Sequence, residues 1–205
     1  MSRVFINAGH HLHDQGTSYG SVKESELAMK IRDLVAGKLS ADYVPDNLDI
    51  KQTIQWINDR ADRKDMAIDI HLNSNKNASI RGVEVYYDTD LALAQSFAKQ
   101  LSEKLKIPNR GAIPDSYTYF GSLGFLQQLN CPSLVIELCY LSNPEDRALI
   151  TNPVFQIDAA RALVEIIKYE TNPTTISILQ SILNKAKEAF SLVLKLWQKR
   201  NSRNS

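Results

Sequence analysis

The stretch MAIDIH spans Met66–His71, and four of its first five residues are apolar. A short apolar run of this kind is typical of a strand buried in a sheet. Three other stretches share the pattern and are predicted as strands: VFI within Arg3–Asn7, GVEVYY at 82–87 and SLVIEL at 133–138. A weaker strand is predicted near Tyr43 and Val44.

Helical patterns alternate with these strands. Within residues 21–39, apolar side chains recur at the spacing of one helix face. Further helices are predicted at 48–61, 91–106, 120–129, 145–150 and 154–169, and loops at 9–20 and 109–116. Strands that alternate with helices indicate an α/β fold, in which helices cover both faces of a sheet.

The composition fits one soluble domain with a small appendage, because 43% of the 205 residues are hydrophobic and 23% are charged. The net charge of +1 gives no sign of a nucleic-acid partner, and none is predicted. Cys131 and Cys139 are predicted to be buried thiols, since their spacing fits neither a disulfide framework nor a metal motif. The first residues lack the apolar stretch of a signal peptide, which predicts synthesis in the cytoplasm without such a signal.

The C-terminal segment differs in charge from the rest of the chain. Residues 171–205 carry six Lys or Arg and one Glu, which leaves residues 1–170 with a net charge of −4. We therefore expect a domain at 1–170 and a separate linker and tail at 171–205. Apolar residues spaced by three and four predict a basic amphipathic helix at 176–199. Three roles stay open for it: packing on the domain or a second copy, lying on an anionic membrane surface, or binding a carrier protein.

Three predicted strands lead into a residue that can bind a metal or act as a base. The first is followed by His10, within INAGHHLHDQG at 6–16, which holds three of the four histidines of the chain. The strand at 66–70 leads to His71, and SLVIE ends at Glu137. Open α/β sheets carry their functional residues at the carboxyl ends of the strands, so we expect these three side chains at one site.

A catalytic metal site needs a third ligand, and Glu24 and Glu26 in ESELAMKI are the candidates. At roughly 100° per residue, Glu24 lies about 20° from Ile31 around the helix axis, and Glu26 about 140°. Glu24 therefore shares the face toward the sheet, whereas Glu26 should face solvent. Ser21 and Glu24 also fit a capping box, which is the alternative interpretation of Glu24.

Alternatives also exist for the two strand-end residues. His71 has a second interpretation as a histidine that is simply hydrogen-bonded at the end of a strand. Glu137 lies between Ile136 and Leu138, and a glutamate in an apolar strand seldom occurs without a charged partner.

Together these segments resemble the zinc-dependent N-acetylmuramoyl-L-alanine amidases of the type 3 class (amidase_3). The resemblance covers about residues 3–168, in the order of the family. Its matching segments are INAGHHLHDQGT, ESELAMKI, DIHLNS, GVEVYY and PSLVIELCYLSNPED. Two residues depart from the usual motif: His11 replaces the first glycine after the ligand, and Cys139 replaces a glycine after Glu137. Both changes could alter the substrate groove.

The resemblance implies a three-layer α/β sandwich around a mostly parallel twisted sheet, phosphorylase/hydrolase-like in type. It implies one Zn²⁺ held by His10, Glu24 and His71, with Glu137 as the catalytic base. The implied reaction is hydrolysis of the amide between N-acetylmuramic acid and L-alanine in peptidoglycan.

The resemblance also suggests roles for neighbouring residues. His11 and His13 are expected in the loop or toward the substrate rather than as ligands. Independently of the resemblance, a ligand imidazole normally donates its other ring nitrogen to a carboxylate or a carbonyl, and Asp14 and Asp69 are candidates for that acceptor. Asn73 and Asn143 match family positions and are expected to fix loops.

The expected enzyme would act on the cell wall, in the periplasm or outside the cell, after release or delivery. A phage-type lysin (endolysin) for cell lysis and a delivered wall-degrading effector are the forms that fit. Two other functions stay open: another zinc amidohydrolase or carboxypeptidase on a related fold, and a catalytically silent peptidoglycan-binding module.

Overall fold

The structure is a computed structural model that describes residues 2–11, 13–119 and 121–172, together with Lys185, Lys187, Phe190 and Ser191. Its centre is a six-stranded sheet in the order β4-β1-β5-β8-β6-β7. The strands are β1 (Val4–Ala8), β4 (Asp42–Tyr43), β5 (Met66–Asn73), β6 (Val83–Tyr87), β7 (Asn109–Pro114) and β8 (Ser133–Tyr140). Only the β6–β8 pair is antiparallel, so the sheet is mostly parallel, as predicted.

The three central strands form because their side chains are buried on both faces. All five residues of β1 are buried, as are the first five of β5 and the first four of β8. Continuous apolar runs are typical of such central parallel strands. The register places His71 of β5 directly beside Glu137 of β8. Two of the predicted site residues are therefore neighbours in the sheet.

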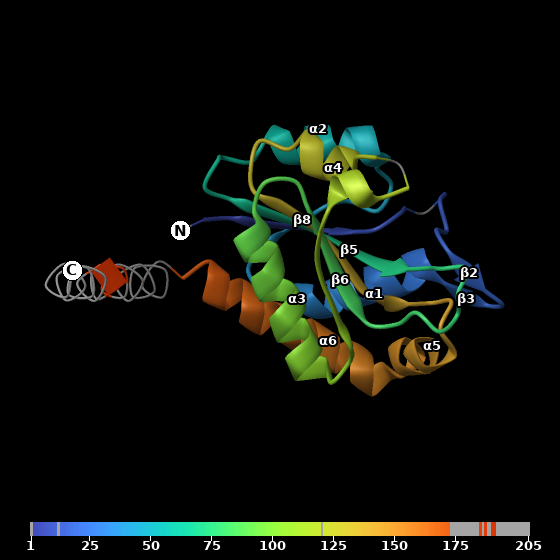
Figure 1. The fold of residues 1–205 in the computed structure, drawn as a ribbon. Helices are drawn as coiled ribbons and strands as arrows, with labels where there is room; N and C mark the ends of the chain where they lie inside the picture. Colours follow the sequence, from blue (N-terminus) through green and yellow to red (C-terminus); the bar gives the residue numbers. More distant parts are fainter. Residues whose placement is uncertain are drawn as a thin grey trace, which may run out of the picture. The chain divides into compact units, whose positions relative to one another are not determined.

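Helices cover both faces of the sheet, which makes the fold the predicted three-layer α/β sandwich (Figure 1). On one face lie α2 (Ile50–Asn58) and the short α4 (Gly124–Gln127). A cluster that includes Phe5, Ile57 and Phe125 fills the space beneath them. On the other face lie α1 (Glu24–Ala36), α3 (Leu91–Leu105) and α6 (Pro153–Glu170), with α5 (Pro144–Thr151) at its end.

The segment before α1 corrects the predicted helix at 21–39. Instead of a helix from Ser21, the chain forms a small hairpin of β2 (Ser18–Tyr19) and β3 (Val22–Lys23). The helix then begins at Glu24, and no side chain caps it. The helix starts later than predicted because the preceding loop folds back, with Thr17 O accepting from Glu24 N at 2.9 Å.

Two further corrections concern residues 109–129. The predicted loop at 109–116 contains β7, which pairs in parallel with β6 at the edge of the sheet. No residue of β7 is fully buried, so the strand lacks the apolar pattern that reveals the central strands. The predicted helix at 120–129 contains only the four residues of α4. Local sequence pattern failed at both places because pairing and packing with distant segments decide the backbone there.

Both cysteines are free and buried, as predicted. Burial raises the pKa of Cys131 to about 11 and that of Cys139 well above its ordinary value. Neither thiol is therefore a reactive thiolate near neutral pH.

The chain separates into two compact units, Met1–Ile166 and Ile167–Ser205. The predicted amphipathic helix at 176–199 lies outside the described residues except at four isolated helical positions. The helix, its three possible roles and the predicted domain border at 170/171 remain predictions. Among the described helices, none is long and apolar enough to cross a membrane.

Candidate metal centre

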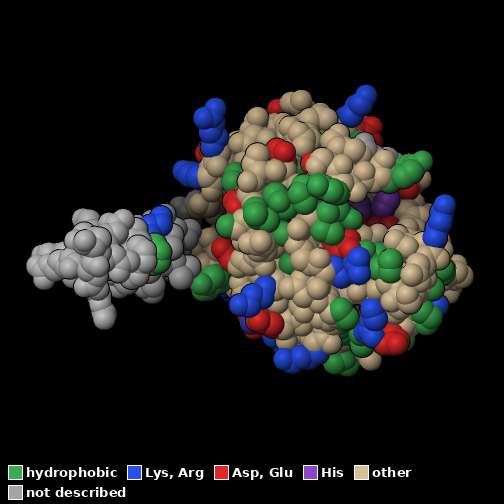
Figure 2. Space-filling view, in the orientation of Figure 1, with side chains coloured by type: hydrophobic (Ala, Val, Ile, Leu, Met, Phe, Trp, Pro, Cys, Tyr) green, Lys and Arg blue, Asp and Glu red, His purple; other side chains and the backbone are tan. Residues whose placement is uncertain are grey.

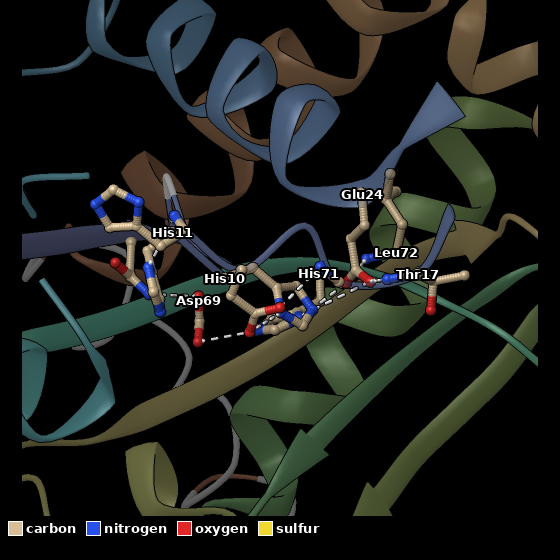
Figure 3. A network of polar contacts seen from close by, with 11 residues as sticks. His10, His11, Thr17, Glu24, Asp69, His71 and Leu72 are labelled. Atoms are coloured by element: carbon tan, nitrogen blue, oxygen red, sulfur yellow. Dashed lines mark hydrogen bonds and ion pairs between the residues drawn. The ribbon is translucent and has the colours of Figure 1, made fainter. Parts of the chain in front are cut away.

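Three of the predicted site residues converge at one point of the structure. His10, Glu24 and His71 each offer a ligand atom, and these atoms all lie within 4.8 Å of one another. His10 Nε2 lies 3.1 Å from Glu24 Oε2, and His71 Nδ1 lies 3.0 Å from Glu24 Oε1. Figure 3 shows the two imidazoles and the carboxylate pointing toward one another. The loop after β1, the start of α1 and the end of β5 supply one residue each.

The carboxylate of Glu24 is fixed by the backbone as well as by the imidazoles. Its Oε1 accepts from Leu72 N at 3.0 Å, and its Oε2 accepts from Thr17 N at 2.9 Å (Figure 3). Glu24 is buried while Glu26 is exposed, as the helical wheel predicted. The capping-box interpretation with Ser21 is wrong, because helix α1 has no side-chain cap and these other groups bind the carboxylate.

Each imidazole also has a carboxylate on its other nitrogen. His10 Nδ1 lies 2.8 Å from Asp14 Oδ2, and His71 Nε2 lies 3.1 Å from Asp69 Oδ2. Both contacts match the sequence-based candidates. Such a carboxylate orients the ring and fixes which nitrogen carries the proton. His10 therefore presents Nε2 to the cluster, and His71 presents Nδ1.

The charges of the cluster are strongly coupled. Burial alone would raise the pKa of Glu24, but the contacts with His10 and His71 hold it well below its ordinary value. Burial would likewise lower the pKa of His71, but Asp69 and Glu24 raise it well above its ordinary value. The pKa of His10 is raised in the same way by Glu24 and Asp14 against the effect of burial. The carboxylates thus make this pocket attractive to cations.

Two glycines allow the cluster to be this compact. A Cβ on Gly9 would lie 2.5 Å from three ring atoms of His71. A Cβ on Gly16 would lie 2.4 Å from the ring of His10 and 2.6 Å from Glu24 Oε2, and Gly16 has a φ of +60°. A side chain at either position would push the imidazoles and the carboxylate apart.

Glu137 lines the same cleft, beside His71 in the sheet. Its Oε2 is buried and has no hydrogen-bond partner among the residues that the structure describes. Burial raises the pKa of Glu137 to about 8; His71 opposes this shift, while the nearby Glu24, Glu84 and Asp69 add to it. An unpartnered oxygen of this kind can accept a proton from a molecule in the cleft.

The cleft has a volume of about 740 Å³, and apolar residues form part of its wall. Figure 2 shows histidine side chains within a hollow on one side of the molecule. The wall comes from the starts of α2 and α4 and the residues just before them, and sequence analysis did not predict its role. Its apolar residues are Leu48, Ile50, Leu123 and Phe125.

The remaining predicted residues take different positions. His11 lines the cleft, whereas His13 is exposed and does not. Cys139 is buried away from the cleft, so its substitution for glycine does not change the lining. Asn143 fixes a loop as expected, because its side chain accepts from the first backbone amides of α5. Asn73 lines the cleft and donates to Glu84 at 3.0 Å.

Comparison with known proteins decides which family has this arrangement. The profile of the N-acetylmuramoyl-L-alanine amidases (Amidase_3) matches residues 4–169. The chain belongs to this amidase family. The match covers all of the described sheet and the whole cleft, so the amidase-family domain contains every residue of the cluster.

Named relatives agree with the family. The "Probable cell wall amidase LytH" of Staphylococcus saprophyticus is 29% identical over 79% of this chain and 56% of its own length. The "N-acetylmuramoyl-L-alanine amidase LytC" of Bacillus subtilis is 26% identical over 78% of this chain and 34% of its own length. The amidase-family chain thus spans 56% and 34% of the length of these two relatives.

A solved structure agrees as well. The crystal structure of N-acetylmuramoyl-L-alanine amidase from Clostridium difficile 630 matches with a TM-score of 0.71 at 26% identity. The match covers 84% of this chain and 98% of that one. The predicted fold class is therefore confirmed.

Proposed function

We propose that this chain is a zinc-dependent N-acetylmuramoyl-L-alanine amidase that hydrolyses peptidoglycan at the cell wall. The observation that carries the proposal is the convergence of His10, Glu24 and His71 within 4.8 Å, beside the unpartnered carboxylate of Glu137. Family membership supports the same reaction: cleavage of the amide that joins the lactyl group of N-acetylmuramic acid to L-alanine.

The residues present fit a catalytic zinc site. Two imidazoles and one carboxylate are a usual ligand set for catalytic zinc, which keeps a further position open. Asp14 and Asp69 provide the outer carboxylates that orient such imidazoles. The proposed ligands are His10 through Nε2, His71 through Nδ1, and Glu24. When bound, zinc supplies Lewis acidity that activates a water molecule and stabilises negative charge on the amide oxygen.

Glu137 is the proposed general base and acid. Its buried carboxylate takes a proton from the attacking water and gives it to the leaving nitrogen of L-alanine. The water oxygen bonds to the carbonyl carbon of the lactyl group, and the bond from this carbon to the amide nitrogen breaks. The products are a free carboxylic acid and a free amine. The apolar wall of Leu48, Ile50, Leu123 and Phe125 limits access of other water molecules and positions the substrate.

Digestion of purified peptidoglycan by the zinc-loaded protein tests the proposal. Mass spectrometry should find free stem peptides with a new amino terminus on L-alanine, and a chelator should stop the release until zinc is restored. Release of terminal amino acids would instead indicate a carboxypeptidase. Binding to the wall without cleavage would indicate a silent module.

A pair of variants on one helix sharpens the test. Glu24→Gln should lose zinc and activity, because Glu24 is the proposed ligand. Glu26→Gln is the matched control, since Glu26 is exposed and pairs with Lys23 at the surface. Equal zinc content and turnover in the two variants would contradict the ligand assignment.

A further inference from the structure

The cleft that would take the peptide stem is acidic. Among the residues that the structure describes, its lining has no lysine and no arginine. Figure 2 shows acidic side chains next to the histidines in the hollow. Five carboxylates line the cleft: Asp14, Glu24, Asp49, Asp69 and Glu137.

A divalent ion would cancel only part of this charge. Three imidazoles line the cleft: His10 and His71 are the proposed ligands, and a ligand imidazole is neutral. Even a positive charge on the third, His11, would together with the ion offset only three of the five carboxylate charges. Arg110 lies on β7 at the sheet edge, but its guanidinium is paired with Glu84. The cleft therefore stays net negative even with zinc bound.

Asp49 also removes a feature that would otherwise attract anions. It is the N-cap of α2, and the positive end of a helix dipole favours a negative ligand. Here the carboxylate of Asp49 already accepts from Gln52 N at 2.9 Å and neutralises that end. The wall of the cleft thus offers an anion no compensating charge.

This charge distribution bears on the second residue of the stem. In peptidoglycan that residue carries either a free α-carboxylate or an α-carboxamide. Two extended residues span about 7 Å at most, so the group stays in the cleft with the reacting amide. A carboxylate there meets like charges, whereas a carboxamide can donate hydrogen bonds to them.

We propose that the cleft selects stems whose second residue carries a carboxamide rather than a carboxylate. The inference rests on the proposed function, because it concerns the substrate of the same site. Asp49 is the specificity-determining residue for this choice, since its carboxylate lines the cleft without belonging to the proposed metal and proton-transfer groups. The other four carboxylates belong to the proposed catalytic machinery.

Two synthetic muramyl peptides that differ only in this group test the proposal. The zinc-loaded full chain should cleave the carboxamide with a kcat/KM roughly tenfold higher at low ionic strength. Added salt should reduce the ratio, because it screens the repulsion.

Two variants of α2 locate the effect. Asp49→Asn should lower the ratio by raising cleavage of the carboxylate substrate, since asparagine keeps the helix cap without the charge. Asp59→Asn is the matched control: it makes the same charge change at the other end of α2, outside the cleft lining, and should keep the ratio.

The outcomes separate the two proposals. Equal cleavage of both peptides, or faster cleavage of the carboxylate, overturns the selectivity and leaves the amidase function standing. An unchanged ratio in Asp49→Asn overturns the role of Asp49. Failure to cleave either peptide with zinc bound overturns the function and the selectivity together.

Discussion

Two buried glutamates in this molecule, Glu24 and Glu84, differ in how their negative charge is balanced. Glu84 is 2% exposed and Glu24 is 3% exposed, so each must find partners for its charge. Glu84 is paired with Arg110 and accepts from Asn73, Tyr86 and Tyr140. Among the described residues, the partners of Glu24 are two imidazoles and two backbone amides.

The difference lies in the source of the positive charge. The guanidinium of Arg110 balances the negative charge of Glu84, and we call this group of residues the closed cluster. No lysine or arginine of the described residues reaches Glu24, and two more carboxylates stand behind its imidazoles. The closed cluster stabilises the fold. The cluster of His10, Glu24 and His71, which we call the open cluster, can instead bind a cation from solution. The predictions below test this contrast.

The largest expected effect is at the carboxylate between the two clusters. Glu137→Gln should lower peptidoglycan hydrolysis by about 10²–10⁴-fold, because the proton-transfer group is lost while the ligands remain. Zinc content measured on the same sample should stay near that of the parent protein. Near-normal turnover would refute the assignment of Glu137.

Removal of a ligand should empty the open cluster. His71→Ala should lose both zinc and activity, since only two proposed ligands remain. Metal analysis after dialysis measures the loss. Zinc retained at full stoichiometry would show that His71 is a hydrogen-bonded histidine and no more.

Changing the carboxylate that contacts His71 should weaken zinc binding without abolishing it. Asp69→Asn should reduce zinc affinity by about 10–100-fold, because the amide orients the imidazole of His71 less well. Competition with a chelator of known affinity measures this, and Asp62→Asn is an exposed control of the same charge change. An affinity equal to that of the control would contradict a positioning role for Asp69.

The closed cluster should respond in stability and not in metal binding. Glu84→Gln should lower the free energy of unfolding by about 1–3 kcal/mol, because Arg110 and the tyrosine hydroxyls lose their charged acceptor. Denaturant titration measures the loss, and zinc stoichiometry should not change. Loss of zinc with an unchanged free energy of unfolding would show that Glu84 supports metal binding rather than the stability of the fold.

The smallest effect concerns the pH dependence of the metal-free protein. Because burial raises the pKa of Glu137 to about 8 in the folded state, the folded state binds this proton more tightly than the unfolded chain. The stability that this group contributes is present at low pH and is lost as pH rises toward and through about 8.

Glu137→Gln should remove that loss. Its melting temperature relative to the parent should rise between pH 5 and pH 9, by roughly 2–4 °C for each kcal/mol. A difference that stays constant over this range would show that the carboxyl group titrates normally in the folded protein.

The sequence predicted the central strands and the convergence of their ends because both follow from local rules. Buried parallel strands need unbroken apolar runs, and MAIDI and SLVIEL provide them. The helical wheel separated Glu24 from Glu26 because the two differ by 200° around one helix axis. Asp14 and Asp69 were candidates from the sequence, but only the structure assigns one to each imidazole.

Other features left no local signal. The edge strand β7 has no fully buried residue, so only its pairing with β6 reveals it. The start of α1 depends on the hairpin of β2 and β3. The apolar wall of the cleft comes from the starts of α2 and α4 and the residues just before them; these two segments are about 70 residues apart and look like ordinary helix positions.

The sequence by itself determined which residue types stand at the ends of the central strands, and thereby the kind of chemistry to expect. Tertiary structure alone decided that Asp49 lines the same cleft as the metal cluster, and that Arg110 pairs with Glu84 instead of lining that cleft. The physical reason is that apolar runs and helical periodicity are properties of residues that are neighbours along the chain. The charge of a cleft is instead a sum over segments that only folding brings together.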